Sequence, residues 1–220
     1  MDWLNYSLFT IGSDTPVLLI DLITSVLGLT CVFLAGRNSK YNFWVGYLYT
    51  AGLALMFFNK HLYASLLLQP VSLGINILGH YRWTHPRKDE EASKGELKVT
   101  MLSWKARVAI MVLIPLMAVL WGWLLFKLGT SWCPGYFPPD PIPYIDALVT
   151  VLIISAQLLS ALKKWECWIL WLFVNATQIT LHLMVGHVFM PIVSLLYLIN
   201  GIVSLVGWMK LYRKENSQGI

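Results

Sequence analysis

The sequence is short of charge. Only 12% of its 220 residues are Asp, Glu, Lys or Arg, whereas 57% are hydrophobic, and the mean hydropathy is +0.64. Soluble domains carry roughly 25% charged residues, so this composition excludes an ordinary water-soluble enzyme. It predicts a protein that folds in the lipid bilayer.

The sequence also lacks paired cysteines and the common motifs of nucleotide, zinc and hydrolase sites. Its cysteines, Cys31, Cys133 and Cys167, form no CxxC pair, which argues against a disulfide framework or a thiol-based metal site. The patterns GxxxxGK[ST], HExxH and GxSxG do not occur. We therefore expect no enzyme activity, no metal, no cofactor, and no ATP-driven transport by this chain alone.

Long apolar segments, by contrast, are abundant. A membrane-spanning helix needs about 20 mainly apolar residues. We therefore predict an all-α integral membrane protein with seven transmembrane helices, at 16–36, 41–58, 62–81, 107–128, 145–162, 166–184 and 188–209. The remaining segments are predicted as an interfacial N-terminal stretch (1–15), a cytoplasmic connector (84–106) with a solvated polar part at 84–98, an external Pro- and aromatic-rich loop (129–144), and a cytoplasmic tail (213–220).

Most basic residues fall on one side of this arrangement. If the N-terminus lies outside, only Lys60 and Lys127 among the 16 Lys and Arg residues are external. Cytoplasmic loops of membrane proteins are enriched in Lys and Arg, so we predict an external N-terminus and a cytoplasmic C-terminus. The net charge of +5 is then a topology signal, and no nucleic-acid partner is expected.

The chain also contains an internal repeat. An offset of 125 residues superposes three pairs of residues: Asp21 with Asp146, Phe43 with Trp168, and Trp83 with Trp208. The two blocks, 16–83 and 145–212, begin four helices apart, so they cross the membrane in the same direction. This predicts a 3+1+3 arrangement of parallel three-helix repeats around a linking helix, 107–128. Such repeats generally hold a substrate between their halves, although gene duplication alone would leave the same pattern.

Polar side chains recur at helical spacing inside the spans. The sixth span carries Trp168, Trp171, Asn175, Gln178 and His182 on one face. Similar stripes occur in the third span (Gln69, Asn76, His80), the fifth (Asp146, Thr150, Gln157) and the seventh (Ser194, Tyr197, Gly201, Ser204). Helix-to-helix hydrogen bonds would explain any one amide, whereas stripes on several helices favour a shared polar cavity with an aromatic platform.

Two carboxylates, Asp21 and Asp146, lie in apolar segments near the predicted outer surface. Acids within a membrane are candidates for a functional role, but a carboxylate near a helix N-terminus is also stabilised by the helix dipole. Both interpretations stay open for Asp21. Asp146 shares a face with Gln157 and is the stronger candidate for the site or its outer gate.

Two stretches, FFNKHLYASLLLQPVSLGINILGHYRW (57–83) and WECWILWLFVNATQI (165–179), resemble the Pnu family of bacterial vitamin transporters. The most specific part is a W-x-x-W-x-x-x-N pattern. The resemblance implies a fold similar to the SWEET sugar transporters, a homotrimer in the bacterial inner membrane, and facilitated diffusion of an unphosphorylated vitamin that cytoplasmic kinases trap. It implies ligand contacts at Trp168, Trp171, Asn175 and Gln69, then Asn76 and Asp146; Gln157, Gln178 and Tyr49 complete the candidate site.

Four positions depart from the nicotinamide riboside pattern of this family: Tyr49 and Cys167 replace Asn, Val193 replaces a polar residue, and His80 replaces Trp. These changes remove polar groups suited to a ribose. The resemblance to PnuT-type members therefore favours thiamine, with PnuC-type transport of nicotinamide riboside as the alternative and riboflavin as a weaker one. Tryptophan faces attract either cationic vitamin by about 0.5–2 kcal/mol.

Two functions of other classes stay open. The chain could be the membrane substrate-binding subunit of an ATP-driven vitamin importer, although it has no evident docking motif of small residues on a cytoplasmic helix face. An integral-membrane enzyme is a weaker alternative, because the spans assemble no nucleophile, metal cluster or acid–base pair.

Overall fold

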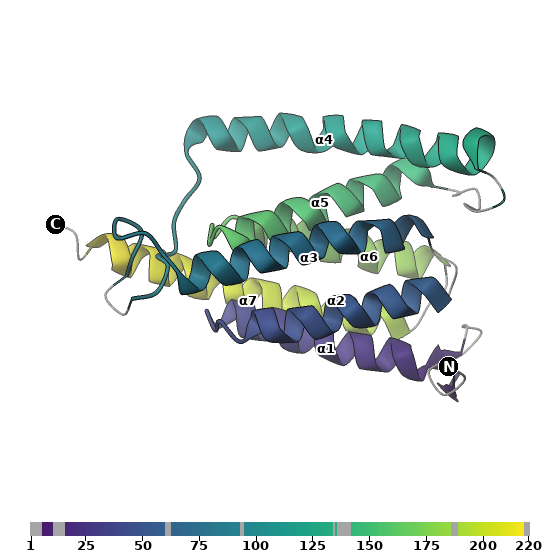
Figure 1. Ribbon diagram of the computed structural model, residues 1–220, viewed down its shortest axis with the longest axis horizontal. Coiled ribbons are helices and arrows are strands. Elements are labelled where there is room, and N and C mark those ends of the chain that lie inside the picture. The colour runs from purple at the N-terminus through teal and green to yellow at the C-terminus, as the bar shows by residue number, and fades with distance from the viewer. Residues whose placement is uncertain are drawn as a thin grey trace.

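The computed structural model describes residues 6–10, 16–59, 63–92, 95–133, 135, 142–185 and 189–217. This part of the chain contains seven long helices (Figure 1): α1 (Leu19–Gly36), α2 (Asn42–Asn59), α3 (Tyr63–Thr84), α4 (Trp104–Lys127), α5 (Pro143–Ala161), α6 (Cys167–Val185) and α7 (Phe189–Ser217). A π-helical turn, η2 (Leu128–Trp132), extends α4. Strands β1 (Ser7–Phe9) and β2 (Val17–Leu18) pair antiparallel ahead of α1.

Within the described residues, four helices are long and apolar enough to cross a membrane by length and composition: α1, α4 with η2, α5 and α7. The apolar part of α6 is shorter, at Cys167–Leu183. α2 and α3 do not reach the same hydropathy, since they contain amides, hydroxyls and tyrosines among their apolar residues. The protein is therefore an all-helical, multi-pass membrane protein in which some helices carry polar interior faces.

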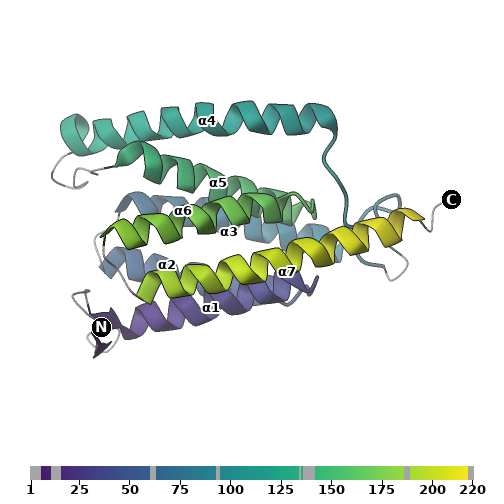
Figure 2. The same ribbon diagram turned by 180° about the vertical axis from the view of Figure 1, so that it is seen from behind.

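Six of the helices pack in a closed ring, in the order α1, α2, α3, α5, α6, α7 and back to α1. α4 packs against α5 outside this ring, and both views show it along the edge of the bundle (Figures 1 and 2). The strand pair before α1 and the C-terminal part of α7 lie at opposite ends of the bundle (Figure 1). The ring leaves an interior that all six helices can line.

The first helix of each three-helix block ends in the same way. Asn38 (φ 61°) and Lys163 (φ 55°) are the non-glycine residues with positive φ in the described part of the chain, and they lie 125 residues apart. The backbone N–H of Asn38 donates to Ala35 O, and the backbone N–H of Lys163 donates to Ser160 O. A left-handed residue after the last helical turn satisfies free carbonyl groups, so α1 and α5 terminate with matching turns.

The connector 84–106 combines exposed residues with a few that pack on the bundle, within its described part. Its second half crosses the end of the bundle, where Leu97 (3% exposed) and Val99 (1%) are buried. Thr100 forms an isolated parallel bridge with Lys164, and Glu166 accepts hydrogen bonds from the Leu102 amide and the Arg107 guanidinium.

Lys163, in the turn after α5, holds this connector against the end of the bundle. Its ammonium group donates to the carbonyl of Leu97 and lies 4.7 Å from the centre of the Trp83 ring. The side chain is only 2% exposed. Burial lowers the pKa of Lys163 to about 8, and the nearby Glu96 and Glu215 partly offset this effect. At the same end, the Arg82 guanidinium accounts for a lowered pKa of Glu90, to which it is hydrogen-bonded at 2.8 Å.

Candidate ligand-binding cavity

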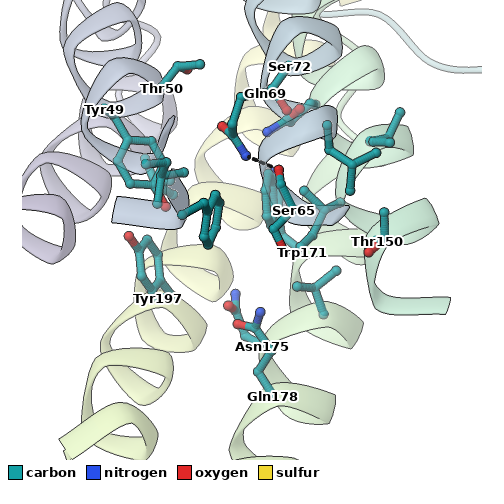
Figure 3. A pocket seen from close by; sticks show the side chains of 18 residues that line it. Tyr49, Thr50, Ser65, Gln69, Ser72, Thr150, Trp171, Asn175, Gln178 and Tyr197 are labelled. Carbon is teal, nitrogen blue, oxygen red and sulfur yellow. Dashed lines mark hydrogen bonds between the residues drawn. The ribbon is translucent and has the colours of Figure 1, made fainter. Parts of the chain in front are cut away.

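A cavity of about 300 Å³ lies inside the ring and receives side chains from all six ring helices. Most of its hydrogen-bonding groups are amides and hydroxyls: Tyr49, Thr50, Ser65, Gln69, Ser72, Thr150, Gln157, Asn175, Gln178 and Tyr197 (Figure 3). Of the described residues that line it, none is Asp, Glu, Lys or Arg. The cavity is therefore polar without being charged.

Aromatic rings border the same space. Trp171 on α6 and Phe57 on α2 both line the cavity, together with the rings of Tyr49 and Tyr197 (Figure 3). Flat π faces beside amides form a surface on which a planar, positively charged ring can stack. The volume lies at the lower end of the range of about 300–1,000 Å³ for small-molecule sites, which suits a ligand of nucleoside size.

The amides differ in how far the protein satisfies them. Gln69 donates from Nε2 to the carbonyl of Ser65, one turn back on α3, at 3.2 Å (Figure 3). The Oε1 atom of Gln157 is buried and accepts no hydrogen bond. An unsatisfied buried acceptor costs about 1–3 kcal/mol, so a bound ligand that donates to Gln157 would recover this energy.

Tyr49 on α2 and Tyr197 on α7 both line the cavity wall, where their side chains lie beside each other (Figure 3). Both rings pack over Gly28 on α1. A Cβ at Gly28 would collide with the Tyr197 hydroxyl and would lie 3.0 Å from the Tyr49 ring. The close approach of three helices at this point thus depends on a residue without a side chain.

A second cavity of about 110 Å³ adjoins the first and lies nearer the connector. The two share several lining residues, including Tyr49, Gln157 and Trp171. The smaller cavity also contacts Phe43 and Trp168, which belong to a buried aromatic cluster at this end. The ring centroids are 5.1 Å apart for Phe43–Trp83, 5.7 Å for Trp83–Trp208 and 5.6 Å for Trp168–Trp208.

The comparison with protein families matches the Nicotinamide mononucleotide transporter model over residues 18–210, nearly the whole chain. The chain belongs to this family. The chain is 29% identical to the nicotinamide riboside transporter PnuC of Escherichia coli K12 over 219 residues. This match covers 91% of this chain and 89% of the relative. The PnuC of Neisseria mucosa is 26% identical, over 89% of this chain and 74% of the relative.

A solved structure of a family member has the same fold. It is described as the crystal structure of the vitamin B3 transporter PnuC, and it superposes with a TM-score of 0.66 at 20% sequence identity, covering 89% of this chain and 83% of that one. The Pnu resemblance is thereby confirmed, with PnuC-type proteins as the relatives. These relatives are named as transporters.

In the present protein, the structure brings together most of the residues that the sequence predicted for the binding site. Six of them line the larger cavity: Tyr49, Gln69, Gln157, Trp171, Asn175 and Gln178. Trp168 and Asn76 line only the smaller one. Trp168 is 1% exposed and packs in the aromatic cluster, while Asn76 donates to the carbonyl of Phe43 at 3.3 Å and so ties α3 to α2.

The two intramembrane carboxylates lie elsewhere. Asp146 is exposed in the first turn of α5 and lines neither cavity. Asp21 is buried in the first turn of α1, where it accepts from the Leu18 amide at 3.2 Å. Both positions fit stabilisation of a helix N-terminus, and at Asp21 the cap is evident.

Sequence reasoning missed the hydroxyl groups contributed by the first three-helix block. Thr50, Ser65 and Ser72 all line the larger cavity. The repeat held a usable signal, because Thr50 is equivalent to Asn175 and Ser72 to Tyr197 at the offset of 125. His80, in the polar stripe of α3, lines neither cavity; its Nδ1 lies 2.9 Å from the Tyr47 hydroxyl.

Proposed function

We propose that the protein carries nicotinamide riboside across the bacterial inner membrane by facilitated diffusion. The observation that carries the proposal is the uncharged cavity of about 300 Å³, in which Trp171 stands beside amides and hydroxyls. A pyridinium ring can stack on tryptophan, a carboxamide pairs with Asn or Gln, and ribose hydroxyls pair with hydroxyl side chains. The two similar transporters described above are named for this ligand.

The charge of the cavity favours the riboside over its phosphorylated form. A phosphate monoester brings about two negative charges, and the described lining contains neither Lys nor Arg to neutralise them. Removing such a group from water without a partner costs several kcal/mol or more. Phosphorylation in the cytoplasm would then trap the vitamin after entry.

The hydroxyl content of the cavity favours the riboside over thiamine. The loss of an Asn at position 49 predicts a less hydroxylated ligand, but Tyr49 itself, with Thr50, Ser65 and Ser72, supplies four hydroxyl groups to the wall. Thiamine has a single hydroxyl and would pair with fewer of these groups than the several hydroxyls of a ribose. The similar proteins also give no support to thiamine, so nicotinamide riboside becomes the proposed substrate.

The transport mechanism that we propose uses two parallel three-helix repeats, α1–α3 and α5–α7, that move relative to each other around the cavity. The matching turns at Asn38 and Lys163 support this. So do five pairs of lining residues at the offset of 125: Val32 with Gln157, Tyr49 with Val174, Thr50 with Asn175, Leu53 with Gln178, and Ser72 with Tyr197. The members of each pair differ, so a symmetric scaffold would hold an asymmetric site.

The end that carries the connector is proposed to face the cytoplasm, because Arg37, Arg82, Arg107 and Lys163 lie there and Lys127 lies near the other end. The homotrimer remains a proposal from the family resemblance. Light scattering of the purified protein in detergent would measure the number of chains.

Uptake into proteoliposomes tests the proposed function. Purified protein, without ATP and with the membrane potential clamped at zero, should equilibrate labelled nicotinamide riboside across the bilayer. Unlabelled riboside should compete, whereas nicotinamide mononucleotide and thiamine should compete weakly. Uptake that requires an added ATPase would instead identify a substrate-binding subunit of an importer, and stronger competition by thiamine would return thiamine as the substrate.

A further inference from the structure

We propose that the neighbouring hydroxyls of Tyr49 and Tyr197 recognise the sugar hydroxyls of the ligand and so distinguish a riboside from a pyridinium cation that has no sugar. This inference rests on the proposed function and names the residues that set its specificity. The pair lies on the wall of the larger cavity (Figure 3).

The chemistry of the pair matches a vicinal diol. Each phenol has one donor and an acceptor oxygen. The two side chains on the cavity wall therefore offer two O–H donors and two acceptor oxygens together. Two neighbouring sugar hydroxyls present the same combination of donors and acceptors.

The pair is held rigidly before any ligand arrives. Its members come from α2 and α7, which belong to different three-helix blocks, and both pack over the buried Gly28 of α1. Because a tyrosine side chain has few rotatable bonds, fixing it costs little entropy on binding. A preorganised polar pair contributes more to binding than mobile hydroxyls would.

The positions of the other groups orient the ligand. In Figure 3 the two tyrosines border one side of the cavity, whereas Trp171 and Thr150 lie on the other. At the offset of 125 the equivalents of the tyrosines are Val174 and Ser72, which cannot form such a pair. The sugar would therefore face Tyr49 and Tyr197, with the pyridinium ring toward Trp171.

Binding measurements on the full-length protein in detergent test this assignment. The probes are nicotinamide riboside and 1-methylnicotinamide, which keeps the cationic carboxamide ring but has no sugar. Tyr49→Phe and Tyr197→Phe each remove one hydroxyl and keep the ring. Tyr47→Phe is the matched control, because Tyr47 lies on the same helix but its hydroxyl contacts His80 outside both cavities.

We expect each cavity variant to weaken riboside binding about tenfold or more, in line with about 1–3 kcal/mol for leaving a buried polar group unpaired. Binding of 1-methylnicotinamide should change less than about twofold, and Tyr47→Phe should alter neither ligand. Equal losses for both probes, or no loss of riboside binding, would overturn the inference.

A ligand-side measurement avoids any effect of the substitutions on folding. The 2′-deoxy and 3′-deoxy ribosides should bind wild type more weakly, and Tyr49→Phe should then cost little further affinity for the analogue that lacks the partner hydroxyl. Additive losses for both analogues and both variants would contradict a direct contact. If wild type binds no riboside but binds thiamine, the proposed function itself fails, which is a different outcome.

Discussion

Trp83 and Trp208 form equivalent hydrogen bonds, each to a backbone carbonyl at the end of a helix in the other three-helix block. The indole of Trp83 donates to Ser160 O on α5, and that of Trp208 donates to Gly36 O on α1, each at 3.2 Å. The last helix of each three-helix block thus closes onto the first helix of the other block, directly beyond the smaller cavity.

These two bonds make a first prediction about access from the connector end. Trp83→Phe and Trp208→Phe keep a ring but lose the N–H donor, which costs about 1 kcal/mol per bond. We expect Cys31, which lines the smaller cavity, to react several-fold faster with a water-soluble thiol reagent in each variant. Mass spectrometry of the labelled peptides measures the rate, with Cys133 as the internal reference. An unchanged rate of Cys31 labelling would show that the two hydrogen bonds do not limit access of the reagent from the connector end.

The two tryptophans of the W-x-x-W-x-x-x-N pattern should respond differently to truncation. Trp171→Ala should weaken riboside binding about tenfold, because it removes a stacking face from the cavity wall. Trp168→Ala should instead lower stability by about 3–5 kcal/mol, because it empties the centre of a buried cluster. Titration and thermal unfolding, carried out on both variants, separate the two roles. Similar effects of both substitutions on affinity, at unchanged stability, would place Trp168 in the binding site.

Discrimination against phosphate is the third prediction. Wild type should bind nicotinamide riboside at least about 100-fold more tightly than nicotinamide mononucleotide, since several kcal/mol of phosphate desolvation finds no basic partner in the described lining. Competition titration against a fluorescent signal from the cavity tryptophan would measure the ratio. Comparable affinities would mean that a basic group reaches the ligand.

Lys163 predicts a pH dependence of stability. Its pKa is about 8 in the folded protein because of burial, against roughly 10.4 in an unfolded chain. Between these values the unfolded state binds one proton more, so stability rises as the pH increases from about 8 toward 10. Thermal unfolding at pH 7, 8 and 9 should show an upward trend in wild type and a weaker one in Lys163→Met. Lys164→Met, which removes a less buried charge from the same turn, should keep the wild-type trend.

The sequence predicted the helices well because a span is a local property. Each of the seven predicted segments overlaps an observed helix, and the ends of α1 and α5 agree closely with the prediction. The polar stripes likewise predicted an interior position for several residues that line the larger cavity, because helical spacing fixes which side chains share a face. These residues are Gln69, Gln157, Trp171, Asn175 and Gln178.

What could not be predicted depends on packing between helices. Nothing in the local sequence distinguishes Trp168 from Trp171, yet Trp168 packs against Trp208 whereas Trp171 lines the larger cavity. Leu97 and Val99 lie in a polar segment, and only the turn between α5 and α6 makes them interior residues. Tyr49 likewise lies beside Tyr197, 148 positions away in the chain, only because both rings pack over Gly28.

The uncharged lining of the cavity has an electrical consequence. Nicotinamide riboside carries a fixed positive charge on its ring nitrogen, and the described walls provide no carboxylate to cancel it. Each molecule that crosses would then move one elementary charge through the membrane field, worth about 2.3 kcal/mol per 100 mV. A cell that is negative inside would concentrate the free vitamin roughly 50-fold at 100 mV, so a passive carrier of this kind acts as an electrogenic one.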